Sequence, residues 1–303
     1  MDAGALDEAV EALKAGDLVG LPTETVYGLA GDARKPESVA KIYAAKGRPR
    51  FNPLIAHVAD LNAAKRQGVF HDRAEALAEA FWPGPLTLVL EARPDGSVCE
   101  LARAGLSTLA VRVPAHPIAQ AVLEHFDGPL AAPSGNRSGS ISPTTADHVR
   151  EGLGGAVSII LDGGACARGL ESSVIGFDGS AAYLLRPGAL AREAIEAVIG
   201  PLLKPKAGAE VSSPGMLSRH YAPQGRLRLN AVIAENGEGL VGFGSVAGDV
   251  SLSTSGDLTE AAARLFACLR DMDRRFSRIA VAPIPDHGLG EAINDRLRRA
   301  STP

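Results

Sequence analysis

The order of apolar segments is the feature of this sequence that most constrains the fold. Residues 18–21, 54–58 and 86–90 are short apolar runs with the length and composition of buried strands. Helical spacing of apolar residues separates some of these strands, as in 36–46 and 72–81, while other strands follow one another directly. We therefore predict an α+β or mixed α/β architecture rather than a simple doubly wound sheet.

The chain of 303 residues is long enough for two domains. Residues 1–200 contain the strands and helices of a first, larger domain. Prolines and many small residues mark 201–225 as a linker. Residues 226–303 contain short strands and two helices, at 258–271 and 289–299, which are typical of a small α/β domain.

Composition narrows the class of protein. The net charge of −4 argues against the overall basic field that binds nucleic acid. The three cysteines, Cys99, Cys166 and Cys268, have neither zinc-site spacing nor the even number of a disulfide framework. The N-terminus lacks the regions of a signal peptide, and no apolar run approaches membrane-spanning length. We therefore expect a soluble, cytoplasmic protein with no membrane partner.

A basic loop follows the helix at 36–46. Lys46 and Arg48 flank one glycine, and this pair suits a polyanion, because Arg binds phosphate bidentately and Lys adds a point charge. The alternative is a solvated helix C-terminus, where the helix dipole favours cations. In either case we expect the loop to contribute little to the core. The segment Ala-Pro-Ser-Gly-Asn at 132–136 favours phosphate, since its small residues allow an anion to approach closely.

Further polar side chains lie at the ends of predicted strands. Thr23 and Thr25 follow the strand at 18–21, where ligand groups often lie, although a turn with packed threonines is equally consistent. Arg112 lies in an apolar strand, so it needs either a structural salt bridge or a ligand carboxylate.

These cations and hydroxyls suit phosphates together with a small polar ligand, and therefore nucleotidyl transfer. No Gly-x-Ser-x-Gly, Walker or dinucleotide motif points to another chemistry. The set of strand-end residues comprises Lys46, Arg48, His57, Arg112, Ser134, Asn136, Ser172 and Arg186.

Seven segments of the first domain form a specific combination of motifs. They are Pro-Thr-Glu-Thr-Val-Tyr-Gly-Leu (22–29), Lys-x-Arg followed by Asn-Pro-Leu-Ile-x-His-Val (46–58), Trp-Pro-Gly-Pro-Leu-Thr (82–87), Ala-Val-Arg-Val-Pro (110–114), Ala-Pro-Ser-x-Asn (132–136), Glu-Ser-Ser-Val-Ile (171–175) and Leu-Arg-Pro-Gly (185–188). Over about residues 5–200 this combination resembles the YrdC-type threonylcarbamoyl-AMP synthases. The His-Tyr-Ala-Pro motif at 220–223 and the extra domain are similar to the long, two-domain form of that family.

The resemblance implies a twisted mixed sheet with a concave basic face, followed by a small Rossmann-like domain. It implies that L-threonine, bicarbonate and ATP are converted to threonylcarbamoyl-AMP and pyrophosphate. The product would serve the threonylcarbamoyladenosine modification next to the tRNA anticodon, which a separate transferase completes. Mg²⁺ would arrive with ATP, since the sequence shows no carboxylate cage for a metal. Whether tRNA or the transferase is a direct partner stays open.

The same resemblance assigns residues to two ligands. The phosphates would be held by four residues that would also be catalytic: Lys46, Arg48, Ser134 and Asn136. The ATP site would be completed by Asn52, Thr108, Ser142, Arg186 and Tyr221. The threonine site would comprise Thr23 or Thr25, His57, Arg112, Ala132 and Ser172.

We expect residues 201–225 to cover the active site rather than to act as a passive tether. A tether needs only Gly, Ser, Pro and solvated charge, whereas this segment contains Met216, Arg219, His220 and Tyr221. Closure would keep water away from a carbamoyl adenylate, which is a mixed anhydride.

Two other functions stay open. A concave basic sheet could bind double-stranded RNA or tRNA by shape, but tracking phosphates needs dispersed cations rather than a tight group with hydroxyls and a histidine. The fold is also shared by carbamoyltransferase-type maturation domains. Those usually accompany zinc-finger segments, and this chain has no paired Cys-x-x-Cys.

Overall fold

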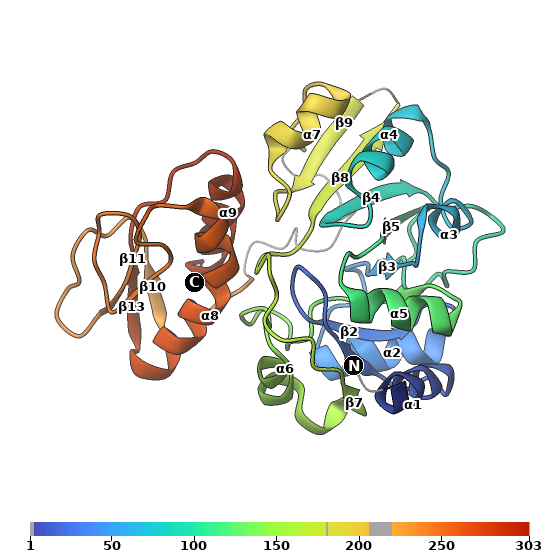
Figure 1. The fold of residues 1–303 in the computed structure, drawn as a ribbon, viewed down its shortest axis with the longest axis horizontal. Coiled ribbons are helices and arrows are strands. Elements are labelled where there is room, and N and C mark those ends of the chain that lie inside the picture. The colour runs from blue at the N-terminus through green and yellow to red at the C-terminus, as the bar shows by residue number, and fades with distance from the viewer. Residues whose placement is uncertain (1–2, 180, 206–219, 303) are drawn as a thin grey trace.

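The computed structural model describes residues 3–179, 181–205 and 220–302, which form two sheets flanked by helices (Figure 1). The larger sheet has nine strands in the order β7-β1-β2-β6-β3-β5-β4-β8-β9. Its strands are β1 (Val19–Leu21), β2 (Gly28–Asp32), β3 (Ile55–His57), β4 (Leu86–Glu91), β5 (Thr108–Arg112), β6 (Leu130–Ala131), β7 (Ile159–Ile160), β8 (Ser173–Asp178) and β9 (Ala181–Arg186). The accompanying helices are α1 (Ala3–Lys14), α2 (Pro36–Lys46), α3 (Leu61–Lys65), α4 (Asp72–Phe81), α5 (Pro117–Phe126), α6 (Ala146–Leu153), a 3₁₀ turn (Gly154–Ala156) and α7 (Arg192–Ile199).

The larger sheet is mixed, as the order of apolar segments predicts. Strand β3 pairs in parallel with β5, and β4 in parallel with β8, whereas β1–β2, β4–β5 and β8–β9 are antiparallel pairs. The helices predicted at 36–46 and 72–81 are confirmed as α2 and α4. The prediction misses β2, whose glycines are typical of a turn, and also α3 and α6, which are only five and eight residues long.

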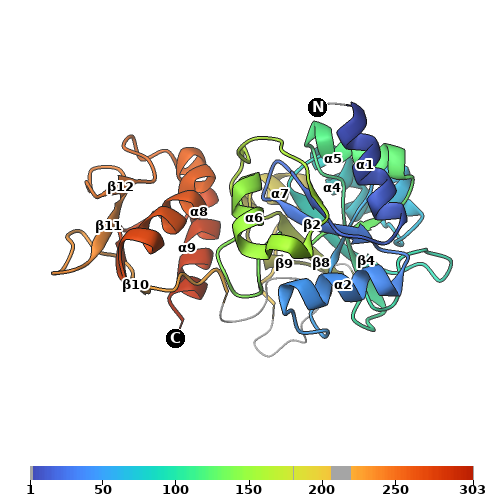
Figure 2. The same ribbon diagram turned by 90° about the horizontal axis from the view of Figure 1, so that it is seen from below.

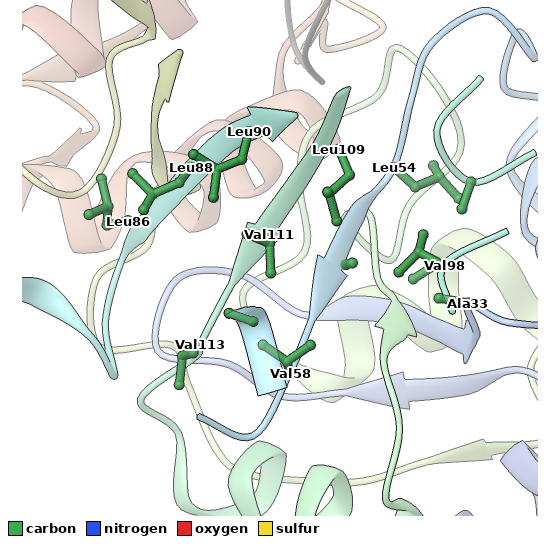
Figure 3. Packing of buried hydrophobic residues seen from close by; sticks show 14 of the residues in the cluster. Ala33, Leu54, Val58, Leu86, Leu88, Leu90, Val98, Leu109, Val111 and Val113 are labelled. Atoms are coloured by element: carbon green, nitrogen blue, oxygen red, sulfur yellow. The ribbon is translucent and has the colours of Figure 1, made fainter. Parts of the chain in front are cut away.

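Apolar side chains alternate with others along the central strands β4 and β5, so one face of the sheet packs in the core and the other face has polar groups. One set of alternating residues packs in the main apolar core (Figure 3): Leu86, Leu88 and Leu90 of β4, Leu109 and Val111 of β5, and Val113. Because successive side chains of a strand point to opposite faces, Thr87, Ala110 and Arg112 lie on the other face. A slip of one residue would exchange the two sets, so burial of the leucines fixes the face that Arg112 occupies.

The smaller sheet consists of the parallel strands β10 (Arg226–Arg228), β11 (Gly239–Gly242), β12 (Val250–Ser251) and β13 (Arg278–Val281), in the order β10-β13-β11-β12. Helices α8 (Leu258–Arg275) and α9 (Leu289–Ala300) lie between this sheet and the larger domain, as Figures 1 and 2 show. Helix α8 begins after Asp257, whose carboxylate accepts hydrogen bonds from two N–H groups of the first turn. This is the small α/β domain that the sequence predicts.

The two domains share an apolar core. Leu170 of the first domain packs in one cluster with Phe266 of α8 and Leu297 of α9. The backbone of Gly169 has a φ of 67° and lies so close to α8 that a Cβ atom there would be 2.4 Å from the carbonyl oxygen of Ala263. Direct packing, rather than a tether alone, therefore joins the domains.

Among the described residues, no helix combines the length and apolar character that crossing a membrane requires. Cys99, Cys166 and Cys268 are free thiols. The segment 206–219, which contains Met216 and Arg219 of the predicted cover, lies outside the described residues.

Candidate active site

A cavity of about 50 Å³ lies where the polar face of the larger sheet meets the loops that connect its strands. Its walls come from the segments after β1, α2 and β6, the ends of β3, β5 and β9, the segment before β8, and residues 220–221. Ten residues that the sequence analysis assigns to a ligand line this cavity: Thr23, Thr25, Arg48, His57, Arg112, Ala132, Ser134, Ser172, Arg186 and Tyr221.

Arg112, at the end of β5, is held by three neighbours. Its Nη2 forms an ion pair with Glu24 at 2.6 Å, its Nη1 donates to Thr25 Oγ1 at 2.9 Å, and its Nε donates to the carbonyl oxygen of Gly84 at 3.1 Å. The side chain is only 4% exposed, so its charge needs this partner. The structural salt bridge is therefore present. Because Arg112 also lines the cavity, its guanidinium is placed to meet a ligand carboxylate as well.

The two threonines of the turn after β1 form a chain of hydrogen bonds with Arg112. Thr23 Oγ1 donates to the carbonyl oxygen of Val26 at 2.6 Å and lies 2.8 Å from Thr25 Oγ1. Since a hydroxyl has one proton, Thr25 donates in the second bond and accepts from Arg112. The predicted turn is therefore present and its hydroxyls line the cavity, while their binding to a ligand stays a prediction.

His57 lies beside Arg112, its neighbour in the β3–β5 register. Its Nδ1 is 3.3 Å from the carbonyl oxygen of Ile55. Burial and the nearby charge of Arg112 lower the pKa of His57 to about 3. The imidazole is therefore neutral near physiological pH, and because Nδ1–H donates to Ile55, Nε2 is left as an acceptor for a polar ligand.

The basic loop after α2 turns into the protein. Gly47, with a φ of 59°, ends the helix, and the N–H of Arg48 donates back to the carbonyl oxygen of Tyr43. The Arg48 guanidinium donates to Asn52 Oδ1 at 2.6 Å and to the carbonyl oxygen of Pro53 at 2.9 Å. Burial lowers the pKa of Arg48 to about 10. The alternative of a solvated helix end is therefore wrong, because Lys46 and Arg48 are buried.

Lys46 is also buried, and it holds the loop that contains Ser134 and Asn136. Its Nζ donates to the carbonyl oxygens of both residues at 2.5 Å. Asn136 Nδ2 in turn donates to the carbonyl oxygens of Arg137 and Ser140 at 2.8 Å. Burial and the charge of Arg48 lower the pKa of Lys46 well below its ordinary value. Ser134 lines the cavity, whereas Lys46 and Asn136 lie behind its wall.

Arg186 reaches the cavity because the pairing of β8 with β9 is irregular near the end of β9. The register shifts next to Val174, which inserts one extra residue, Leu185, into β9. Beyond this bulge, Arg186 Nη2 donates to the carbonyl oxygen of Ser172 at 2.8 Å and to its Oγ at 3.2 Å. The Ser172 hydroxyl is also hydrogen-bonded to Thr87 Oγ1 at 2.7 Å. The bulge therefore brings a cation to the position of a predicted ligand hydroxyl.

Glu171 connects the cavity to the second domain. Its Oε1 accepts from Ser142 Oγ at 2.5 Å, and its Oε2 accepts from Arg296 Nε at 2.9 Å. Burial alone would raise the pKa of this carboxyl, but the charges of Arg296 and Arg186 and the bond from Ser142 lower it to about 2. Glu171 is therefore an anion among cations, and it lines the cavity.

Tyr221 and His220 form the wall that the linker contributes to the cavity. The Tyr221 ring stacks on Phe266 of α8 with 5.5 Å between ring centroids. The φ of Tyr221 is 64°, a backbone conformation that residues other than glycine rarely adopt. The N–H of Ala222 fixes the chain here by donating to the carbonyl oxygen of Gly139 at 2.8 Å. Such a strained position is typical of a residue that serves a site.

Two family models match successive parts of the chain. One described as Telomere recombination (Sua5/YciO/YrdC) matches residues 11–188, and one described as Threonylcarbamoyl-AMP synthase, C-terminal domain, matches residues 190–302. The chain belongs to the Sua5/YciO/YrdC family.

Relatives match nearly the whole chain. It is 38% identical to a Bacillus subtilis protein named threonylcarbamoyl-AMP synthase, over 97% of this chain and 92% of that protein. It is 41% identical to a Pyrococcus abyssi protein of the same name, over 95% of this chain and 92% of that protein. A solved structure described as P. abyssi Sua5 complexed with L-threonine has a TM-score of 0.91 at 38% identity, covering 98% of this chain and 94% of that chain.

Five residues that the Sua5/YciO/YrdC resemblance assigns to ATP do not line the cavity. Two of them, Asn52 and Ser142, are bonded to residues that do, namely Arg48 and Glu171. Thr108 is separate, because it begins β5 and lines a second hollow. The remaining two are Lys46 and Asn136, which hold the loop behind the cavity.

Three charged residues of the site were not predicted from the sequence, namely Glu24, Glu171 and Arg296. Each glutamate precedes a proposed ligand residue within a motif, and buried arginines need carboxylate partners, so a signal for both existed. Arg296 is one of three arginines in the last two turns of α9, and only tertiary packing distinguishes the buried one.

Proposed function

We propose that this member of the Sua5/YciO/YrdC family joins L-threonine, bicarbonate and ATP to give threonylcarbamoyl-AMP and pyrophosphate, for the threonylcarbamoyladenosine modification of tRNA. The observation that supports this most is one cavity with Arg112, suited to a carboxylate, and with Arg48 and Arg186, suited to phosphate. An amino acid and a nucleotide can meet there. Relatives at 38% and 41% identity are named for this synthase.

The amino-acid half of the cavity comprises Thr23, Thr25, His57, Arg112, Ala132 and Ser172. Arg112 would bind the carboxylate of L-threonine, while the neutral His57 and the Thr25 hydroxyl would bind its polar groups. This assignment is supported by the structural relative from P. abyssi, whose crystals contain L-threonine.

The nucleotide half comprises Arg48, Ser134, Arg186 and Tyr221 at the cavity, with Lys46, Asn52, Asn136 and Ser142 behind it. Arg48 and Arg186 would neutralise the triphosphate. Burial lowers the pKa of both arginines, and a bound anion would reverse this effect. Lys46 would position the loop at 134–136 beside the phosphates.

Thr108 would mark the adenosine end of the nucleotide site. It lies on the same face of β5 as Arg112, with Ala110 between them. A small apolar cluster on this face would support the adenine ring, and it comprises Ile55, Val89, Ala110, Val174 and Leu185. ATP would then extend across the sheet from Arg48 toward Thr108.

The reaction would need two bond-forming steps. The threonine amine first combines with bicarbonate, with loss of water, to give a carbamate. A carbamate oxygen then attacks the α-phosphorus of ATP, the bond from that phosphorus to the bridging oxygen breaks, and pyrophosphate leaves. Arg48 and Arg186 would stabilise the charge that develops on the phosphates, so positioning and neutralisation supply most of the catalysis.

Mg²⁺ would arrive on the triphosphate. Within the described ranges no group of three or more His, Cys, Asp or Glu side chains could hold a metal ion, whereas a triphosphate supplies oxygen ligands of its own. The ion would neutralise phosphate charge when bound.

His220 and Tyr221 would exclude water from the reacting groups. A cavity of about 50 Å³ is far smaller than the ~300–1,000 Å³ of small-molecule sites, so it would have to widen to hold both reacting groups. These two residues form a wall that belongs to neither sheet. Their place supports the prediction that the linker covers the site.

Pyrophosphate release tests the proposal. We expect the purified protein to form pyrophosphate and threonylcarbamoyl-AMP only when ATP, bicarbonate and labelled L-threonine are all present. Pyrophosphate release at an equal rate without threonine would contradict the synthase function. A module that only binds double-stranded RNA or tRNA would show neither dependence and would instead retain RNA in a salt-sensitive manner.

A further inference from the structure

A buried ion pair joins the second domain to the cavity. Arg296, on α9, is fully buried, and its Nε donates to Glu171 Oε2 at 2.9 Å. Its Nη1 donates to the carbonyl oxygen of Pro187 at 2.9 Å and to Asp295 Oδ2 at 2.8 Å. Arg296 therefore has two carboxylate partners, whereas the buried Glu171 carboxylate relies on the nearby charge of Arg296.

Glu171 links Arg296 to two groups of the nucleotide half. The other oxygen of its carboxylate accepts from Ser142 Oγ at 2.5 Å. The carbonyl oxygen of the next residue, Ser172, accepts a hydrogen bond from the guanidinium of Arg186. A displacement of Glu171 would therefore disturb both Ser142 and the backbone that orients Arg186.

Arg296 also contacts Tyr221 directly. Its guanidinium carbon lies 5.1 Å from the centroid of the tyrosine ring, within the range of a cation–π interaction. The same ring stacks on Phe266 of α8, so both contacts come from helices of the second domain. These contacts hold the ring of Tyr221 at the wall of the cavity.

We propose that Arg296 is a positioning residue for ATP, contributed by the second domain to the nucleotide half of the active site. It acts by fixing Glu171 and Tyr221, and it touches neither substrate. The inference rests on the proposed function and extends it, because it gives the second domain a role in substrate binding. The amino-acid half has a carboxylate of its own, Glu24, which bonds Arg112 and the N–H of Ala115 within the first domain.

Helix α9 offers a matched control. Glu291 forms an ion pair with Arg192 of α7 at 2.6 Å, so this pair also joins the two domains. Both side chains are partly exposed, and neither is among the residues that line the cavity. Glu291→Gln therefore removes an ion pair between the domains from the same helix without touching the nucleotide half.

The experiment compares Arg296→Lys, Arg296→Gln and Glu291→Gln in the full chain. Calorimetry measures the binding of a non-hydrolysable ATP analogue, and steady-state pyrophosphate release measures the KM of ATP and of threonine. We expect Arg296→Lys to weaken ATP binding about tenfold, because an ammonium cannot replace a planar guanidinium with several fixed donors. Arg296→Gln should weaken it further, since Glu171 is then left without its partner.

The remaining readouts separate positioning from general loosening of the domain contact. The KM of threonine should change by less than about twofold in the Arg296 variants. In Glu291→Gln, the KM of both ATP and threonine should stay within about twofold of the wild-type values. Equal losses for ATP and threonine would overturn the inference, as would a loss of ATP binding in Glu291→Gln equal to that in Arg296→Lys. Unchanged ATP binding by a folded Arg296→Gln protein would also overturn it.

Failure of the proposed function can be told apart from failure of this inference. If the wild type bound the ATP analogue but made no threonylcarbamoyl-AMP, the synthase proposal would be wrong, while the binding measurements would still decide the role of Arg296. If the wild type did not bind the analogue, both would be wrong.

Discussion

Each half of the cavity contains a buried ion pair between an arginine and a glutamate, but the arginine comes from a different domain in each half. In the amino-acid half, Arg112 is buried against Glu24, and both residues belong to the first domain. In the nucleotide half, the buried carboxylate is Glu171, and its arginine partner, Arg296, comes from the second domain, 125 residues along the chain. The buried arginine of one half is thus paired within the first domain, whereas the buried carboxylate of the other half has its arginine partner in the second domain.

The largest expected effect is loss of a phosphate-binding cation from the nucleotide half. Arg48→Ala should reduce turnover by about ten- to more than a hundredfold, because charge-assisted hydrogen bonds contribute roughly 1.5–3 kcal/mol. It should also lower the Tm, since Arg48 is buried and bonds Asn52 and Pro53. The control is Arg50→Ala, which removes an exposed arginine from the same loop and should leave turnover unchanged. Less than twofold loss at saturating ATP would count against a role for Arg48.

An effect of intermediate size is expected in the amino-acid half. Arg112→Ala should raise the KM of threonine by about tenfold or more and leave the KM of ATP nearly unchanged. Glu24→Gln should show a weaker version of the same pattern, because it loosens Arg112 without removing it. Steady-state pyrophosphate release with each substrate varied gives both constants. If Arg112→Ala lowered only stability and left the KM of threonine as it was, the salt bridge would be purely structural.

The smallest expected effect is an acid-dependent loss of the contact between the domains. The pKa of Glu171 is depressed to about 2, so ionised Glu171 stabilises the fold above its ordinary pKa and loses this contribution as the pH falls toward 2. The difference in unfolding free energy between wild type and Glu171→Gln should therefore be larger at about pH 6 than at about pH 3. Urea unfolding at the two pH values measures it. A difference that did not change with pH would show that Glu171 is not held as an anion.

The amino-acid half could be predicted from the sequence in part. The patterns place Thr25, His57 and Arg112 at the ends of strands, and the resemblance assigns them to one ligand. The β3–β5 pairing that puts His57 beside Arg112 is visible only in the structure. The order of elements also predicts the mixed sheet. The Glu24 partner was missed, although the need of a buried arginine for a carboxylate points to it.

The nucleotide half depends on features that no local pattern shows. Arg48 is buried because Gly47 turns the chain inward, and Arg186 faces the cavity because of a bulge in β9. Arg296 is selected from several arginines only by the packing of α9 against the first domain. Thr108 was assigned by resemblance, and the structure places it at a separate hollow on the same strand.

The most direct test of two halves in one active site is equilibrium binding of each substrate alone. Calorimetry would measure L-threonine and a non-hydrolysable ATP analogue against the wild type, Arg112→Ala and Arg48→Ala. We expect Arg112→Ala to weaken the affinity for threonine by about tenfold or more and to change the affinity for the ATP analogue by less than about twofold. Arg48→Ala should show the reverse. If each variant lost both ligands to the same extent, the division of the cavity into an amino-acid half and a nucleotide half would be wrong.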